Sequence, residues 1–600
     1  MSELAVVIPS RNEIFLRRTI EDLLANMRGD TRIIAVLDGQ WADPPVDQHP
    51  KVTLIYHPES VGQRAACNEA AKIAFDSKYI MKCDAHCAFD EGFDVKLMAD
   101  MQDDWTVVPI MRNLHTFDWV CKNGHRRYQS PSGPCKECGE PTEMEVVWIP
   151  KRSPQSLSYC FDAEPHFQYF GEYLKREGVS GDFNETMSLQ GSCFMMTRDK
   201  WFELDVCDES FGSWGSQGIE VAVKTWLSGG RVICNHKTWY AHQFRTQGGD
   251  FGFPYELSGR QVEHAKKTAR GLFFTNSWPK QVRPLSWLVE KFWPVKGWTD
   301  EDLERIREFD HVIGNTKVTP VEEPDRLELC SDDTAVVVDD GHGTGTDDVR
   351  NPVGIVSNSD KDVRRGVLYY TDNRITPLIQ LACQRQIAEC ADIWGMPIVS
   401  VSLLPMDFGT NISIPLERGY LTMFKQILMG LIMLEVDVVY FCEHDVLYSP
   451  SHFEFIPLND DTYYYNQNCW KVDYNTGHSL YYDCKQTSQL CAKRELLITH
   501  YTKRVLRVEK EGFSRKMGFE PGSHGRSERV DDYGSDIWRS ETPNIDIRHD
   551  ANLTSSRWKQ EEFRDKRNCR NWQDADEVPG WGYVGKTFQT LLGHISRTHS

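Results

Sequence analysis

Short apolar segments alternate with helical patterns along the first 90 residues of the chain, and each apolar segment ends in polar residues. The segments have the length and the β-branched content of buried strands, and they cover residues 5–8, 32–37, 52–56 and 79–83. Between them, apolar residues recur three and four positions apart, as on one face of a helix. This alternation predicts an α/β fold, in which helices cover both faces of a mainly parallel sheet. Ligands of such sheets bind at the carboxyl ends of the strands, so the residues that follow the strands are the first candidates for a site.

The fourth predicted strand leads directly into Asp84 and His86. Side chains two residues apart in an extended segment point to the same side, so a carboxylate and an imidazole converge here. One oxygen and one nitrogen ligand suit a borderline cation such as Mn2+ better than Mg2+, which prefers oxygen ligands alone. A capped strand end with an incidental histidine is the alternative for this pair taken by itself.

Further motifs follow along the chain. It opens with Ile8-Pro9 and Asn12-Glu13, and later motifs cover residues 191–198, 211–220, 226–231 and 242–245. Over roughly the first 250 residues, this ordered set resembles the GT-A glycosyltransferases of the family 2 and polypeptide N-acetylgalactosaminyltransferase type. The resemblance implies a Rossmann-like nucleotide-diphospho-sugar transferase fold. It also implies transfer of a hexosyl or N-acetylhexosaminyl group from a UDP-sugar, with retention of the anomeric configuration.

The resemblance implies roles for individual residues as well. Asp84, His86 and His242 would hold Mn2+ (or Mg2+) against the diphosphate of the donor. Contacts to the nucleotide are implied at Pro9, Arg11, Glu13, Asp38 and Arg64. Catalytic or substrate contacts are implied at Trp214, Gln217, Glu220 and Arg245. Gln217 stands where the family has a glutamate, and an amide cannot act as a general base.

Four cysteine and histidine residues have the spacing of a structural zinc site. Cys121 and His125 form one pair, and Cys135 and Cys138 form the other. Thiolate and imidazole ligands in this number favour tetrahedral Zn2+. We expect a small zinc ribbon inserted in the first domain at about residues 118–145. A loop of reduced cysteines is the alternative.

The length of 600 residues predicts two to four domains. An acidic stretch rich in Asp, Gly and Thr separates two such units, so we expect domains at residues 1–317 and 356–600 and a linker at 318–355. The chain shows neither an apolar run of membrane-spanning length nor a secretory signal, and its 18 cysteines lack the framework of a small secreted domain. These features predict a cytoplasmic protein with reduced thiols and without a membrane partner.

The second half of the sequence repeats the pattern of the first, in which a predicted strand ends in candidate metal ligands. A predicted strand at 437–442 ends in Glu443-His444-Asp445, and His549 follows about a hundred residues later. This pattern resembles a second GT-A domain, with Mn2+ held by Glu443, Asp445 and His549. Nucleotide contacts are expected at Asp372 and Arg374, which follow an earlier strand. A degenerate copy that only binds acceptor or serves as a scaffold is the competing interpretation.

Three hypotheses about function follow. The chain is a tandem transferase that adds one or two sugars in sequence, or a single active transferase with a non-catalytic partner domain, or a non-catalytic protein that binds sugar nucleotides or glycans, which the glutamine at position 217 suggests. The acceptor is a hydroxyl. A polypeptide Ser or Thr or a glycan follows from the resemblance, while the zinc ribbon and the expected cytoplasmic setting point to a hydroxymethylpyrimidine in viral DNA. A net charge of −20 argues against broad electrostatic binding of DNA.

Overall fold

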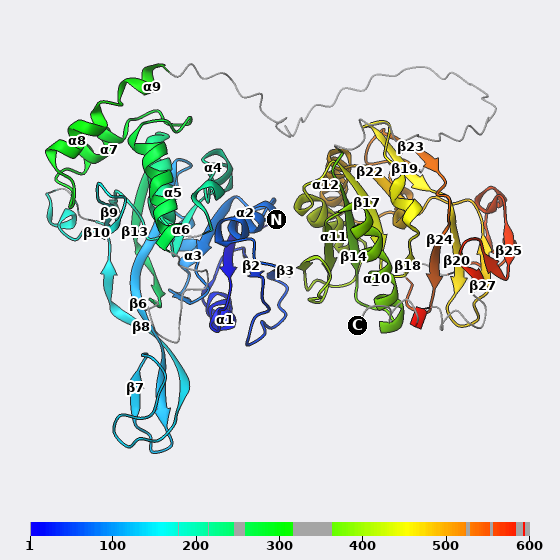
Figure 1. The fold of residues 1–600 in the computed structure, drawn as a ribbon, viewed down its shortest axis with the longest axis horizontal. Helices are drawn as coiled ribbons and strands as arrows, with labels where there is room; N and C mark the ends of the chain where they lie inside the picture. Colours follow the sequence, from blue (N-terminus) through cyan, green and yellow to red (C-terminus); the bar gives the residue numbers. More distant parts are fainter. Residues whose placement is uncertain are drawn as a thin grey trace.

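A computed structural model describes residues 2–177, 179, 181–213, 215–244, 259–315, 363–523, 529–552, 556–583 and 592–593. The elements form two lobes that lie side by side (Figure 1). The first lobe contains residues up to 315, and the second contains residues from 363 onward. The predicted linker at 318–355 lies outside the described residues, so the domain boundaries around it remain predictions.

The core of the first lobe is a parallel sheet in the order β3-β2-β1-β4. Its strands are β1 (Leu4–Ser10), β2 (Thr31–Asp38), β3 (Val52–His57) and β4 (Tyr79–Cys83). Nearly all of their residues are buried, because helices α1 (Leu16–Asn26) and α2 (Gln63–Ile73) pack against the sheet. The predicted α/β fold and the parallel order of these four strands are confirmed.

Beyond β4 the sheet changes direction. Strand β12 (Cys193–Thr197) pairs with β4 in the antiparallel sense and also touches β6 (Trp105–Cys121). Strand β13 (Arg231–His242) runs parallel to β6 and pairs antiparallel with the short β5 (Cys87–Phe89). The mixed half therefore brings the end of β13 next to the turn that follows β4. Helix α5 (Gln217–Leu227) covers this half, and its Gly218 touches the backbone at Leu189 so closely that an added Cβ would lie 2.0 Å from the carbonyl oxygen.

Strand β6 continues beyond the sheet into a long arm. It pairs with β8 (Thr142–Ser156), and β7 (Arg126–Tyr128) lies against its far end. The arm projects well away from the lobe (Figure 1). At its base, Trp148 packs against Phe15 and donates its indole N–H to Asp22 of α1 at 2.9 Å. This anchor fixes the direction in which the arm leaves the sheet.

The second lobe repeats the core of the first. Its parallel sheet has the order β16-β15-β14-β17, and β22 pairs antiparallel with β17, just as β12 does with β4. The strands are β14 (Arg365–Thr371), β15 (Ile398–Ser402), β16 (Thr410–Ser413), β17 (Val438–Glu443) and β22 (Leu490–Lys493). Helices α10 (Pro377–Trp394) and α11 (Tyr420–Met433) occupy the positions of α1 and α2 in the element order. A further sheet contains β24 (Asn544–Arg548), which pairs with β18 (Val446–Leu447) and with β20 (Cys469–Asp473).

The two lobes share one continuous sheet. The third strand of each repeat, β3 and β16, pair antiparallel, with Ile55 opposite Ile412. Helices α2 and α11 touch across the same boundary, where Lys72 also forms an ion pair with Glu435. Equivalent elements thus meet around a pseudo-twofold axis. Because the junction is antiparallel, the parallel strands of the two lobes run in opposite directions, and their carboxyl ends lie at opposite edges of the joint sheet.

Within the described parts of the chain, no helix combines the length and apolar character needed to cross a membrane.

Candidate active site

Three side chains from distant parts of the first lobe converge at the carboxyl end of β4. Asp84 and His86 lie in the turn between β4 and β5, and His242 ends β13. Nε2 of His242 lies 3.1 Å from Oδ2 of Asp84 and 3.1 Å from Nε2 of His86. Their ligand atoms all lie within 4.8 Å of one another. The structure therefore brings together the three residues that the sequence analysis proposed as one metal site.

The electrostatics of this cluster suit a divalent cation. Burial lowers the pKa of His242 to about 4 and also lowers the pKa of His86, so both rings are neutral and able to ligate at neutral pH. Burial raises the pKa of Asp84, but the Lys82 ammonium and His242 lower it more, and the carboxyl stays ionised. Oε1 of Glu13 lies 3.2 Å from Nδ1 of His86, and such a carboxylate fixes the orientation of a ligating imidazole. One carboxylate and two neutral imidazoles with converging atoms form a donor set that fits Mn2+.

The cluster lies in the wall of a cavity of about 480 Å³. The predicted nucleotide contacts Pro9, Arg11 and Glu13 line this cavity, and so does the predicted catalytic residue Gln217. Gln217 donates its side-chain N–H to Sγ of Cys207 at 3.1 Å, which holds the amide against the cavity wall.

Asp38 lies below the surface of the site and does not line the cavity. It is fully buried, and its carboxylate accepts hydrogen bonds from the hydroxyl of Ser60 at 2.9 Å and from the backbone N–H groups of Val61 and Gly62 at 2.6 and 3.0 Å. The loop before α2 therefore occupies the acceptor atoms that the sequence analysis assigned to the nucleotide.

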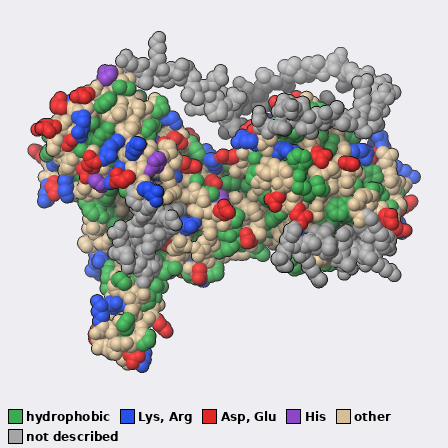
Figure 2. Space-filling model, in the orientation of Figure 1, with side chains coloured by type: hydrophobic (Ala, Val, Ile, Leu, Met, Phe, Trp, Pro, Cys, Tyr) green, Lys and Arg blue, Asp and Glu red, His purple; other side chains and the backbone are tan. Residues whose placement is uncertain are grey.

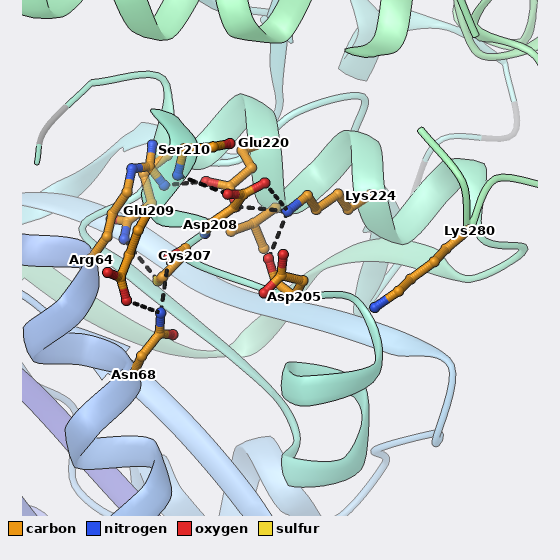
Figure 3. A network of polar contacts seen from close by, with 12 residues as sticks. Arg64, Asn68, Asp205, Cys207, Asp208, Glu209, Ser210, Glu220, Lys224 and Lys280 are labelled. Carbon is orange, nitrogen blue, oxygen red and sulfur yellow. Dashed lines mark hydrogen bonds and ion pairs between the residues drawn. The ribbon is translucent and has the colours of Figure 1, made fainter. Parts of the chain in front are cut away.

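Arg64 and Glu220 do not line the cavity either, and their side chains point toward each other (Figure 3). Glu220 is fully buried; besides Arg64, it accepts hydrogen bonds from the backbone N–H of Asp208 at 2.9 Å and from Lys224 at 3.2 Å. Arg64 also donates to the carbonyl of Gly215 at 2.5 Å. The network ties α2 and α5 to the loop at 207–215. This placement corrects the expectation of direct substrate contact, because both side chains are neutralised and enclosed by protein.

Two predicted residues, Trp214 and Arg245, lie outside the described residues, and their assignments remain predictions. In contrast, Lys82 faces the cavity and was not singled out in the sequence. A lone lysine inside the apolar strand Tyr79–Cys83 is the signal that could have identified it. Burial lowers the pKa of Lys82, but Asp84 raises it more, and the net pKa lies above its usual value.

The comparisons with known proteins agree with this geometry. The sequence profile of glycosyl transferase family 2 matches residues 5–137, which include the parallel sheet, Asp84 and His86. The first lobe therefore carries a family 2 glycosyltransferase domain of the GT-A type.

Curated relatives extend the likeness of the glycosyltransferase domain. A putative polypeptide N-acetylgalactosaminyltransferase 13 of Drosophila melanogaster is 24% identical over 309 residues, which are 48% of this chain and 48% of the relative. A probable N-acetylgalactosaminyltransferase 9 of Caenorhabditis elegans is 29% identical over 101 residues, or 16% of each chain. A crystal structure of GalNAc-T7 with UDP, GalNAc and Mn2+ is matched with a TM-score of 0.33 and 15% identity, over 51% of this chain and 55% of that one. The chain thus spans about half, or less, of the length of the curated relatives that it matches.

The second lobe carries a comparable cluster at the equivalent place. His444 and Asp445 follow β17, and His549 follows β24. Oδ2 of Asp445 lies 3.5 Å from Nε2 of His549 and 3.9 Å from Nε2 of His444. Oδ1 of Asp445 is buried without a hydrogen-bond partner among the described residues, which fits a place for a cation. A cavity of about 230 Å³ opens beside the cluster.

The ligand set of this second cluster differs from the predicted one. Glu443 lines the cavity but is not part of the cluster; it accepts a hydrogen bond from the hydroxyl of Tyr370, and burial and the nearby Asp445 raise its pKa to about 8. His444 takes its place beside Asp445. His444 and Asp445 lie in the turn after β17, which ends at Glu443, so the alternation of a strand no longer decides which of these side chains lie together. Asp372 lines the cavity and forms a 2.6 Å ion pair with Arg418, whereas Arg374 does not line it.

The four predicted zinc ligands meet at the far end of the arm. Sγ of Cys121 lies 3.7 Å from Sγ of Cys138, and Sγ of Cys135 lies 3.6 Å from Nδ1 of His125. All four ligand atoms lie within 4.8 Å of one another. A backbone N–H of Glu140 is the main cause that lowers the pKa of Cys138, to about 6, and so favours the thiolate that binds a metal.

Proposed function

We propose that the first domain transfers a sugar from a UDP-sugar to a hydroxyl acceptor with Mn2+ as its metal. The observation that carries this proposal is the convergence of Asp84, His86 and His242 in the wall of one cavity within a family 2 domain. These residues would hold the cation, which supplies Lewis-acid stabilisation of the departing diphosphate. The cavity wall carries three cationic side chains, Arg11, Lys82 and Lys266, against two carboxylates, Glu13 and Asp84. A net positive wall in a chain of net charge −20 suits an anionic donor.

The same proposal includes a retaining reaction and an N-acetylhexosaminyl or hexosyl donor. The names of the curated relatives support N-acetylgalactosamine as the sugar. Both wall carboxylates, Glu13 and Asp84, are engaged with the metal cluster. Retention needs no protein base, because the diphosphate leaves from the face that the acceptor attacks, and its oxygen can take the acceptor proton.

Two acceptor classes have a specific observation in their favour. A polypeptide Ser or Thr is supported by the names of the relatives. A hydroxymethylpyrimidine in viral DNA is supported by the arm, which begins beside the metal cluster, where Asn113 pairs with His242. The arm exposes Tyr128, Lys151 and Arg152, and basic side chains are visible along it in Figure 2. A zinc ion in the arm and a cytoplasmic setting belong to this proposal, and they are supported by the four converging ligands and by the free thiols of the described cysteines.

The second domain is proposed as a further metal-dependent transferase that adds a second sugar. The repeated strand order and the cluster of His444, Asp445 and His549 at the equivalent place support it. The alternative is a non-catalytic copy that binds acceptor, which the smaller cavity favours.

The test is a turnover assay with labelled UDP-sugars, a Ser/Thr peptide and hydroxymethylated DNA. The wild-type chain should transfer label with Mn2+ and stop in EDTA. Asp84→Asn should lower transfer at least about a hundredfold, since it removes a ligand of the charge-stabilising metal. Asp445→Asn should abolish only the outer sugar, and Asp565→Asn, at an exposed site on the second lobe, should change neither. If no donor and acceptor pair gives EDTA-sensitive turnover, the chain is a binding protein and the proposal is wrong.

A further inference from the structure

A lysine ammonium lies directly beneath the metal ligand Asp84. Lys82 is fully buried within β4, between Val7 of β1 and Phe194 of β12. Its Nζ donates to Oδ1 of Asp84 and, at 2.7 Å, to the carbonyl of Gly191. An ammonium at this depth is tolerated only when it is paired, so Lys82 and Asp84 form a fixed unit in the cavity wall.

The two oxygens of Asp84 face different groups. Oδ1 faces Lys82, while Oδ2 lies 3.1 Å from Nε2 of His242 and 4.0 Å from Nε2 of His86. Lys82 is therefore outside the ligand set but shares its single carboxylate. A metal held at Oδ2 and the ammonium at Oδ1 repel each other across one carboxyl group.

The charges near this carboxylate favour an anion as the partner of the metal. The three proposed ligands bring one negative charge, that of Asp84, and Lys82 cancels it. Glu13 lies on the far ring nitrogen of His86. In the second cavity the balance is reversed: the wall holds five carboxyl groups and two arginines, and four carboxyl groups still outnumber the arginines when Glu443, with its pKa of about 8, is left out. These carboxyl groups are Asp372, Glu443, Asp445, Glu520 and Asp546, and the arginines are Arg418 and Arg548.

We propose that Lys82 makes metal binding at the first site depend on the diphosphate of the nucleotide. The site binds Mn2+ weakly by itself and tightly once a nucleoside diphosphate supplies negative charge, so metal and donor enter and leave together. Lys82 acts here as a positioning residue through Asp84. This inference rests on the proposed Mn2+ and nucleotide site of the first domain.

A purely structural lysine would behave in the opposite way. If Lys82 only held Asp84 in place, its removal would loosen a ligand and weaken Mn2+ binding. If Lys82 opposes the metal, its removal strengthens binding of Mn2+ alone and shrinks the effect of the nucleotide on Mn2+ affinity. The effect of Mn2+ on nucleotide affinity shrinks by the same factor, because binding couplings are reciprocal. The sign of the change separates the two roles.

The experiment is a titration of Mn2+, followed by the EPR signal of the free ion, with and without UDP. All variants are full chains carrying Asp445→Asn, so that the second cluster contributes least. In the reference chain, which keeps Lys82 and carries only Asp445→Asn, we expect UDP to raise the Mn2+ affinity at least about a hundredfold. Lys82→Met should bind Mn2+ alone about tenfold more tightly and show a correspondingly smaller UDP effect. Lys82→Gln, which keeps a donor for Gly191, should do the same and guards against a folding defect in the Met variant.

The matched control is Lys266→Met, which removes a lysine of the same cavity wall whose Nζ contacts His166 and Glu263 instead of Asp84. Its Mn2+ affinity without nucleotide should stay within about threefold of that of the reference chain. Unchanged or weaker binding in both Lys82 variants overturns the inference while leaving the proposed function intact. If the reference chain, which keeps Lys82, binds no Mn2+ with or without UDP, the proposed function itself is overturned.

Discussion

At the scale of single residues, the neutral state of the two histidines determines how the site responds to pH. Burial lowers the pKa of His242 to about 4 and lowers that of His86 as well. Protons compete with a metal for an imidazole only below its pKa, so this competition is shifted toward acid. An ordinary histidine of pKa 6.5 would weaken metal binding about tenfold at pH 5.5. We therefore expect the affinity for Mn2+ without nucleotide to fall by less than about tenfold between pH 8 and 5.5. An EPR titration over this pH range measures the affinity, and a tenfold loss of affinity at pH 5.5 would contradict the lowered pKa values of the two histidines.

The sequence predicted some of these residues and missed others for physical reasons. Asp84 and His86 could be paired from strand alternation, and His242 was joined to them only through family resemblance. Lys82 lies in the same strand but was read as part of an apolar run. Arg64 and Glu220 are 156 positions apart, and no sequence pattern shows that two such charges neutralise each other in a buried pair. Contacts of this kind depend on the packing of α2 against α5.

At the scale of elements, the stability of the arm depends on the zinc-ligand cluster at its far end. Cys121 lies where β6 ends, and the two strands of the arm are joined through the zinc-ligand cluster. Because three cysteine sulfurs and one imidazole converge there, we expect one tightly bound Zn2+ per chain. Cys138→Ser should release it, as measured by a colorimetric zinc assay, and make the arm cleavable by protease at low doses that spare the wild type. Cys484→Ser, at a partly exposed thiol of the second lobe, is the control. Equal zinc content in the two variants would contradict this site.

The sequence predicted strands best where the pattern of apolar residues within one segment is enough to identify them. The four strands of the parallel sheet follow from apolar runs and their polar ends. The antiparallel β12, the 17 residues of β6 and the pairing of β13 with β5 join segments far apart in the chain, and local patterns carry no information about such partners. The arm was expected as a small insertion, but the strand register shows that its strand β6 continues the sheet of the first lobe.

At the scale of the whole molecule, the antiparallel junction of β3 with β16 separates the two candidate sites. The clusters at 84–86 and 444–445 both follow the fourth strand of their repeat, so they lie at opposite edges of the joint sheet. Internal symmetry of this kind resembles an isologous dimer made within one chain. An acceptor leaving one site therefore does not face the other. Under the proposed function, the first product must be released and bound again before it receives a second sugar.

This geometry predicts that the two sites work equally well on separate chains. Asp84→Asn and Asp445→Asn chains are mixed in equal amounts and compared with wild type at the same concentration of intact sites. Because the singly glycosylated acceptor diffuses between sites, the doubly glycosylated product should appear in the mixture after the same lag and at the same rate as in wild type, followed by mass spectrometry. Each variant alone should make none of it. A wild-type rate about tenfold above that of the mixture at low acceptor concentration would instead require direct transfer between the edges, which the strand directions at β3 and β16 oppose.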